Sequence, residues 1–270
     1  MSDGSGGFSR FDLYELTVQN AGALVPLLMA IHGGTPRARL LAEDFCGTAA
    51  LAREWVRTVK RGRATGMDID AGPLAHARGS LRGAVRLVRG DVLATRAPRG
   101  PKADIIFVGN FSIGEIHTRR VLVRYLRRCR ERLAKGGVFI CDIYGGASAF
   151  KTGAVQRMHP VPGDAATRIR YTWHQREANP ITGMVENALH FRVERAGEIV
   201  QEMTDAFVYH WRLWSLSELR EAMLEAGFAR VEVYNKMLDA TDSEGNAYVL
   251  PVEDPADLGE NWIVCVAGRG

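Results

Sequence analysis

The sequence has few cysteines and no long apolar run, and both absences narrow what the protein can be. Its four cysteines, Cys46, Cys129, Cys141 and Cys265, are far apart and form neither a metal-ligand spacing nor a disulfide framework. Each lies in an apolar segment, which predicts buried, reduced thiols. No apolar run approaches the roughly 18 residues that span a bilayer, and the start, MSDGSGGFSR, lacks the apolar region of a signal peptide. We therefore expect a soluble, cytoplasmic protein without a membrane partner.

Lysine is scarce relative to arginine, although the net charge is only +4. Arginine prefers bidentate contacts with phosphate or carboxylate, so a nucleic acid is one candidate partner. A charge of this size over 270 residues is weak support for it, because scattered solvated arginines explain the same number. The hydrophobic content of 46% and charged content of 24% are typical of a globular protein. We expect a single domain over residues 1–270 with a modest insertion.

Strand and helix patterns alternate through the first half of the chain. We expect strands at 39–45, 64–68, 85–88, 103–108 and 138–143, and helices at 48–59, 73–81 and 119–133. Alternation of this kind predicts a parallel, doubly wound sheet, with its core at 37–150. Two helices, at 11–20 and 21–31, precede it, and His32-Gly33-Gly34-Thr35-Pro36 ends the second. We expect residues 10–36 to form a helical lid.

The rhythm changes after the fifth strand. Residues 169–177, 184–195 and 199–214 alternate with period two, and turn-forming residues separate them at 179–183 and 196–198. These runs predict an antiparallel insertion at 165–214 that covers the substrate. A capping box at Ser215 and Glu218 opens a helix to about 226, and strands at 231–234 and 262–267 complete the core sheet, so that 215–268 is its C-terminal part. One face of the insertion would carry Tyr171, Trp173, Leu189, Phe191, Val193, Phe207, Tyr209 and Trp211. This face either forms an aromatic cage for the acceptor or packs on the sheet or on a second subunit, so a homodimer stays open.

The most informative segment is 40–51, LLAEDFCGTAAL. An apolar strand ends there in Glu43 and Asp44 and passes through Gly47 into a helix of small residues. The next two strands also end in acids, Asp68 and Asp91. Acids at the carboxyl ends of successive parallel strands are typical of sheets that bind an adenosine nucleoside.

These residues resemble the class I S-adenosylmethionine (SAM)-dependent methyltransferases over residues 10–145 and again near 215–268. The segment 43–49 is similar to the glycine-rich turn of that family, and 133–137 to its turn into strand five. The resemblance implies a Rossmann-like α/β fold with a seven-stranded sheet, mostly parallel with an antiparallel last strand, plus the antiparallel insertion. It also implies SAM as cofactor and S-adenosylhomocysteine as product. The segments 173–175, 179–182 and 209–214 resemble a little-characterised bacterial branch of this family.

The same resemblance implies roles for individual residues at the cofactor site. Asp68, followed by Ile69, would receive the ribose hydroxyls, and Asp91 with Val92 would hold and flank the adenine. Glu43, preferred over Asp44, would bind the methionine ammonium directly or through water, unless one of these acids merely caps the following helix. The full set that we expect to line the cofactor is Tyr14 (on the first helix, closing over it), Glu43, Phe45, Gly47, Asp68, Ile69, Asp91, Val92, Asn110 and Phe111.

The turn departs from the family at two positions, where Phe45 and Ala49 replace the first and third glycines. Glycine supplies positive φ and close approach, so Phe45 predicts an unusual turn with its ring directed away from the methionine moiety. The same departures disfavour a dehydrogenase, whose pyrophosphate needs a G-x-G-x-x-G turn.

The turn after the fourth strand holds the candidates for a catalytic base, Glu115 and His117. Histidine titrates near neutral pH and could accept a proton from an attacking nucleophile. Their alternative interpretation is that of ordinary polar residues before a helix. The turn lacks the Asn/Asp-Pro-Pro-aromatic motif that the DNA-amine methyltransferases share, and no carboxylate cluster predicts a metal. We expect N- or O-methylation of a small-molecule acceptor; the alternatives are an RNA or protein methyltransferase and a SAM-binding module without catalysis.

Overall fold

The computed structural model describes residues 7–34, 37–81, 83–94 and 100–270. They divide into two compact units, which we describe separately. The core unit comprises Asn20–Ala149 and Leu213–Gly270, and the second unit comprises the chain up to Gln19 together with Phe150–Arg212. Thr35 and Pro36 of the expected helix stop, and the tip at 1–6, lie outside the described residues. No described helix is both long enough and apolar enough to cross a membrane.

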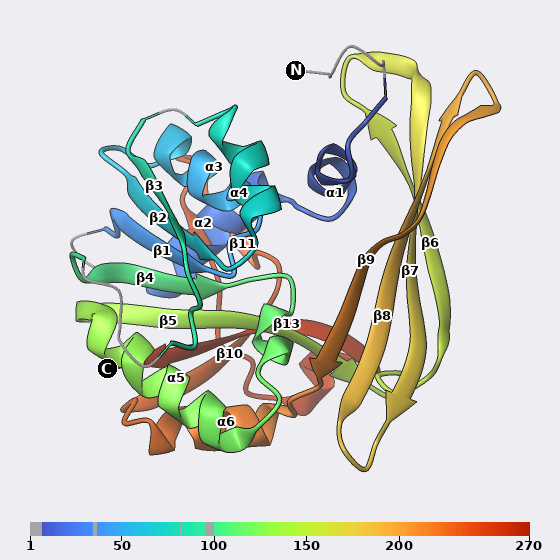
Figure 1. The fold of residues 1–270 in the computed structure, drawn as a ribbon. Helices are drawn as coiled ribbons and strands as arrows, with labels where there is room; N and C mark the ends of the chain where they lie inside the picture. The colour runs from blue at the N-terminus through green and yellow to red at the C-terminus, as the bar shows by residue number, and fades with distance from the viewer. Residues whose placement is uncertain (1–6, 35–36, 82, 95–99) are drawn as a thin grey trace. The chain divides into compact units, whose positions relative to one another are not determined.

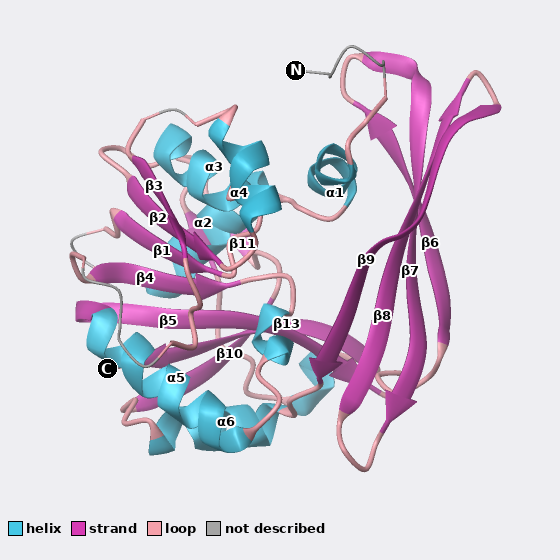
Figure 2. Cartoon of the chain, in the orientation of Figure 1, coloured by secondary structure: helices cyan, strands magenta, loops and turns pink. Residues whose placement is uncertain are grey.

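The described residues of the core unit form a seven-stranded sheet with the order β10-β13-β5-β4-β1-β2-β3 (Figures 1 and 2). Its strands are β1 (Leu40–Asp44), β2 (Arg63–Asp68), β3 (Val85–Arg89), β4 (Ala103–Val108), β5 (Leu133–Gly146), β10 (Arg230–Asn235) and β13 (Asn261–Arg269). The pairs β4–β5, β1–β4, β1–β2 and β2–β3 are parallel. β13 runs antiparallel to both of its neighbours, β5 and β10. This confirms the predicted fold class, including the antiparallel last strand.

Helices cover both faces of this sheet (Figure 1). α2 (Ala21–His32), α3 (Ala50–Thr58) and α4 (Ala71–Arg78) pack on one face, whereas α5 (Arg119–Arg132) and α6 (Leu216–Glu225) pack on the other. Alternate strand residues point to the two faces, so that Ile106 packs on the α5 face while Ile105 and Phe107 pack on the α3 face. Short elements complete the unit: η1 (Ser112–Glu115), η2 (Pro255–Leu258), β11 (Ala240–Thr241) and β12 (Ala247–Tyr248).

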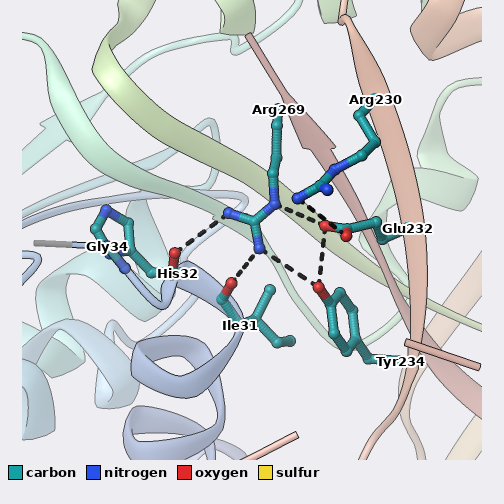
Figure 3. Close-up of polar contacts among 7 residues, drawn as sticks. All are labelled: Ile31, His32, Gly34, Arg230, Glu232, Tyr234 and Arg269. Carbon is teal, nitrogen blue, oxygen red and sulfur yellow. Dashed lines mark hydrogen bonds and ion pairs between the residues drawn. The ribbon is translucent and has the colours of Figure 1, made fainter. Parts of the chain in front are cut away.

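An arginine cluster fastens α2 to the amino-terminal edge of the sheet (Figure 3). The Arg269 guanidinium, at the end of β13, donates to the carbonyl oxygens of Ile31 and, at 3.2 Å, of His32. A cation at the C-terminus of a helix interacts favourably with the helix dipole. The Arg269 Nε also donates to Glu232 Oε2 of β10 at 2.6 Å. The cluster therefore has a structural role, at the edge opposite to the carboxyl ends of the parallel strands.

The second unit is a four-stranded antiparallel sheet with one helix. Its strands follow chain order: β6 (Gly153–Val161), β7 (Asp164–Asn179), β8 (Met184–Arg195) and β9 (Glu198–Arg212). α1 (Arg10–Thr17) packs on it through the fully buried Leu13, against Ile169 and Phe191 among others. Part of the aromatic face is thus covered by the chain's own first helix. The expected helix pair at 10–36 is divided between the two units, and its function as a lid remains a prediction.

β6 was not predicted, and it lengthens the insertion at its N-terminal side. Nearly all its side chains are exposed, as on an edge strand paired on one side only with β7. The apolar alternation that marks half-buried strands is therefore absent from its sequence.

Candidate functional site

The candidate site is the carboxyl edge of the core sheet, where strand order reverses between β4 and β1. In open α/β sheets the ligand crevice lies outside the carboxyl ends of the strands at such a switch point. The turns after β1, β2, β3 and β4 carry nearly all the residues predicted for the cofactor. The topology therefore brings these turns to one edge, as the sequence predicts.

Asp68 joins the turns after β1 and β2. Its Oδ2 accepts the Gly47 N–H at 2.7 Å, and its Oδ1 accepts the Asp70 N–H at 2.9 Å. A carboxylate offers about four lone-pair sites, so Asp68 keeps acceptor capacity for a ligand. Ile69, the next residue, is 65% exposed despite its apolar side chain. An acceptor beside an exposed apolar side chain fits a ribose with its base.

The turn after β3 follows directly alongside. The Gly90 N–H donates to the Asp68 carbonyl oxygen at 2.8 Å, which continues the edge from β2 to β3. Asp91 is exposed, and its Oδ1 accepts the Leu93 N–H at 2.7 Å. Val92 is half-buried against the α5 face of the core. Asp91 therefore presents a carboxylate, and Val92 an apolar wall, at the end of the edge farthest from β4.

The two acids that end β1 have different environments, because they point to opposite faces of the sheet. Asp44 is 1% exposed and forms a bidentate ion pair with Arg132 of α5 at 2.6 and 2.8 Å. Its Oδ2 also accepts the Tyr125 hydroxyl at 2.7 Å. These contacts give Asp44 a structural role, fastening β1 to α5.

Glu43 faces α3 and is 7% exposed. Its Oε2 accepts the Ala52 N–H at 3.1 Å, one of the unpaired donors in the first turn of α3. Burial raises the pKa of Glu43 to about 8; the Ala52 hydrogen bond opposes this rise and the charge of Asp68 adds to it. Helix capping, the alternative weighed for these two acids, therefore falls on Glu43 itself. A role toward the cofactor would be additional and stays a proposal.

The turn after β1 keeps a left-handed backbone at all three glycine positions of the family pattern. Phe45, Gly47 and Ala49 have φ values of 56°, 52° and 54°. For a residue with a Cβ this conformation costs about 1–2 kcal/mol. The Phe45 ring packs edge-on against Tyr125, 6.3 Å between centroids, in the core of the α5 face. The side chain thus contributes packing that partly offsets its own backbone strain.

The turn after β4 is strained in the same way, at two successive residues. Asn110 and Phe111 have φ values of 53° and 63°. Their N–H groups donate to the two oxygens of Asp142 on β5, at 3.1 and 2.7 Å. Asp142 is fully buried and forms an ion pair with Lys236, the residue after β10. Asp142 and Lys236 are not among the residues predicted from the sequence. A single acid within the apolar run 138–143 was a signal for Asp142, because buried charges need partners.

The candidate bases lie on the same turn, a few residues further on. Glu115 ends η1 and His117 follows, and both side chains are exposed. Between them Ile116 is buried, and its carbonyl oxygen accepts the Trp214 Nε1–H at 3.0 Å. The main chain is therefore fixed while both polar side chains face outward. Their role as bases stays a prediction.

Tyr14 is the one predicted cofactor residue that belongs to the second unit. It lies on α1, where its ring contacts Phe207 of β9 at 5.0 Å between centroids. Its approach to the cofactor remains a prediction. Within the described ranges no group of three or more histidine, cysteine, aspartate or glutamate side chains is placed to hold a metal ion.

Comparison with known proteins agrees with this geometry. Residues 44–137 match the family model of a methyltransferase domain. DesVI of Streptomyces venezuelae superposes with a TM-score of 0.69 at 20% identity, covering 97% of this chain and 99% of its own. CalS10, an amino pentose methyltransferase from Micromonospora echinaspora, superposes with a TM-score of 0.66 at 17% identity over 100% of both chains. KedS8, a sugar N-methyltransferase from Streptoalloteichus sp ATCC 53650, gives 0.64 at 17%, over 100% of this chain and 96% of its own.

At these identities the structural likeness establishes the fold. A search of curated proteins found no match. Residues 44–137, which lie within the core unit, match a methyltransferase domain, and the solved methyltransferase structures share the fold of the chain.

Proposed function

We propose that the protein transfers the methyl group of SAM to a nitrogen or oxygen of a small-molecule acceptor. The observation that carries this proposal is the carboxyl edge, where Asp68 joins two turns and still has free acceptor capacity beside the exposed Ile69. Asp68 would receive the ribose hydroxyls, and Asp91 with Val92 the adenine. Glu43 and Gly47 would then face the methionine end, together with the turn of Asn110 and Phe111.

For the acceptor we propose an amine, with amino sugars as the first class to test. Two proteins of the same fold are described as an amino pentose methyltransferase and a sugar N-methyltransferase. SAM supplies an electrophilic methyl group on a sulfonium. An attacking amine must present a free lone pair, so a group that removes its proton aids transfer near neutral pH. His117 and Glu115 are the exposed groups on the turn after β4 that could take that proton. Alignment of the two reactants supplies much of the remaining rate enhancement.

Calorimetry with SAM tests the cofactor assignment. Asp68→Ala should weaken SAM binding by roughly 100-fold, since hydrogen bonds to a charged group contribute about 1.5–3 kcal/mol each. Asp70→Ala is the matched control, because Asp70 caps α4 through the Gly72 N–H at 2.8 Å and has no assigned role at the cofactor. It should lose about 1 kcal/mol of stability while SAM affinity stays at the wild-type value. Equal affinity in wild type and Asp68→Ala would show that the site is misassigned.

Turnover then separates the candidate functions. The wild-type protein is incubated with SAM and, in separate reactions, with a panel of amino sugars, with RNA and with protein substrates, and both S-adenosylhomocysteine and methylated product are measured. Product from a sugar amine supports the proposal. Product only from RNA or protein substrates would favour the alternative of an RNA or protein methyltransferase. SAM binding without product from any acceptor would favour the module without catalysis.

A further inference from the structure

One buried carboxylate holds the strained turn after β4. A left-handed conformation is uncommon for a residue with a side chain, and for a bulky one such as Phe111 it is an outlier. Such conformations persist only where the surroundings fix them. Here the fixing group is Asp142, whose two oxygens each accept one N–H of the turn, from Asn110 at 3.1 Å and from Phe111 at 2.7 Å. Each carboxylate oxygen thus accepts a hydrogen bond from the backbone of this turn.

Lys236 provides the countercharge for Asp142 and also contacts the turn itself. A fully buried carboxylate needs a countercharge, which Lys236 provides as an ion-pair partner with a side chain 22% exposed. The Lys236 ammonium also lies 5.5 Å from the centroid of the Phe111 ring, within cation–π range. The Tyr144 ring meets that of Phe111 edge-on at 4.9 Å. Both the main chain and the side chain of Phe111 are therefore held by groups on β5 and after β10.

The position of this turn points to its ligand. The adenosine end of the cofactor is assigned to the turns after β2 and β3, through Asp68 and Asp91. β4 adjoins β1 on the other side of the switch point, so the methionine end of SAM must extend toward the turn after β4. An ion pair that fixes the conformation of this turn therefore also fixes the surface that would contact the sulfonium of SAM.

We propose that Asp142 and Lys236 are positioning residues, which hold the Asn110–Phe111 turn in the conformation that receives the methionine end of SAM. This proposal rests on the proposed function, because it assumes that SAM binds at this edge. A purely structural ion pair would change stability alone. A pair that shapes the site must change SAM affinity beyond what the loss of stability explains.

The chain offers a matched control for this distinction. Glu232 and Arg269 form another partly buried ion pair between β10 and β13, at the opposite edge of the same sheet (Figure 3). Glu232→Gln should lower the melting temperature through the loss of that pair. It should leave the turn after β4 unchanged.

The experiment measures SAM affinity by calorimetry and thermal unfolding for the wild type, Asp142→Asn, Lys236→Met, Lys236→Arg and Glu232→Gln. We expect Asp142→Asn and Lys236→Met to bind SAM at least about tenfold more weakly, as for a lost charge-assisted hydrogen bond. Lys236→Arg keeps the cation and should restore most of the affinity. Glu232→Gln should bind SAM as the wild type does.

Three results would overturn the proposal. Wild-type affinity in both Asp142→Asn and Lys236→Met would do so, as would an equal loss in Glu232→Gln at the same melting temperature. If Asp142→Asn does not fold, equal affinities of Lys236→Met and Lys236→Arg decide against it. Absence of SAM binding in the wild type would instead refute the proposed function, and with it this proposal. The two failures are therefore distinguishable.

Discussion

Replacing Glu43 by glutamine removes a carboxyl group that the fold buries beside two other acids. Glu43 is 7% exposed, and burial raises its pKa to about 8, with Asp68 and Asp44 adding to the rise. In the free protein at neutral pH the group is therefore mostly protonated. Glutamine has the same shape, and its amide oxygen can still accept the Ala52 N–H that Glu43 accepts at 3.1 Å. The variant thus isolates the effect of the ionisation.

The effect on stability has a definite sign. The pKa of Glu43 in the folded state lies above its ordinary value of 4.5, so between these two pH values the folded state holds a proton that the unfolded state has lost. The stability from this group is fully present below pH 4.5 and declines as the pH rises toward 8. Each pH unit within that window is worth up to about 1.4 kcal/mol. From pH 5 to pH 7 the wild type should therefore lose roughly 2–3 kcal/mol relative to Glu43→Gln.

The effect on SAM follows from the same ionisation. If Glu43 binds the methionine ammonium, it must first lose its proton. SAM affinity should then rise by nearly tenfold per pH unit between pH 6 and 7, and binding should release a proton. Glu43→Gln should bind more weakly and show no such rise.

Two assays on three proteins check this reasoning. Urea unfolding at several pH values gives the free energies, and calorimetry in two buffers of different protonation enthalpy gives the proton release. Glu54→Gln on α3 is the control, because its hydrogen bond to Arg57 lowers the pKa of Glu54 rather than raising it. If the stability difference between wild type and Glu43→Gln is the same at pH 5 and pH 8, burial does not raise the pKa of Glu43. If wild-type affinity for SAM stays flat over pH 6–7, the ammonium assignment is wrong.

Substitutions at two further positions test the surroundings of the same turn. Asp44→Asn should lower the free energy of unfolding by about 3 kcal/mol, because it leaves the partly buried Arg132 without its countercharge; a loss below about 1 kcal/mol in urea unfolding would contradict a structural role. Ala49→Val should lower it by about 2 kcal/mol or more, since a β-branched residue fits poorly at φ 54° in a filled core, whereas Ala49→Gly should stay within about 1 kcal/mol of the wild type. Equal melting temperatures for Ala49→Val and Ala49→Gly would show that the left-handed conformation is not a constraint.

Most of the core fold could be predicted because the buried strands and helices of the core unit have clear apolar patterns in the sequence. The fourth strand, predicted at 103–108, is Ala103–Val108 in the structure, since its apolar run is buried along nearly all its length. The capping box of Ser215 and Glu218 is present with both of its hydrogen bonds. The sequence of β6 has no such pattern, because an exposed edge strand needs no apolar alternation. The division of the first two helices between the units is also absent from the sequence, since each helix merely requires an apolar partner surface.

In the candidate site, too, residues placed by local geometry could be predicted, whereas partners that lie far along the chain could not. Asp68 and Asp91 could be found because an acid directly after a strand reaches the carboxyl edge through local geometry alone. The different faces of Glu43 and Asp44 follow from the period of two along a strand, but the partner of Asp44 does not. Arg132 lies 88 residues from Asp44, and Lys236 lies 94 residues from Asp142. Contacts at such separations depend on the packing of whole elements, and no local pattern encodes them.

The left-handed backbone conformation of the turns after β1 and β4 could not be predicted from the positions of glycine alone. The sequence drew attention to Phe45 and Ala49 as departures, yet both keep the conformation that glycine would adopt, and Asn110 and Phe111 adopt it as well. Four of the seven non-glycine residues with positive φ in the described part of the chain therefore lie in the two turns that flank the β1–β4 switch point. Hydrogen bonds within the protein fix both turns: the Gly47 N–H donates to Asp68 in the first, and the Phe111 N–H donates to Asp142 in the second. Strain that folding has already compensated need not be overcome on binding, so the missing glycines are consistent with a preorganised cofactor edge rather than a disabled one.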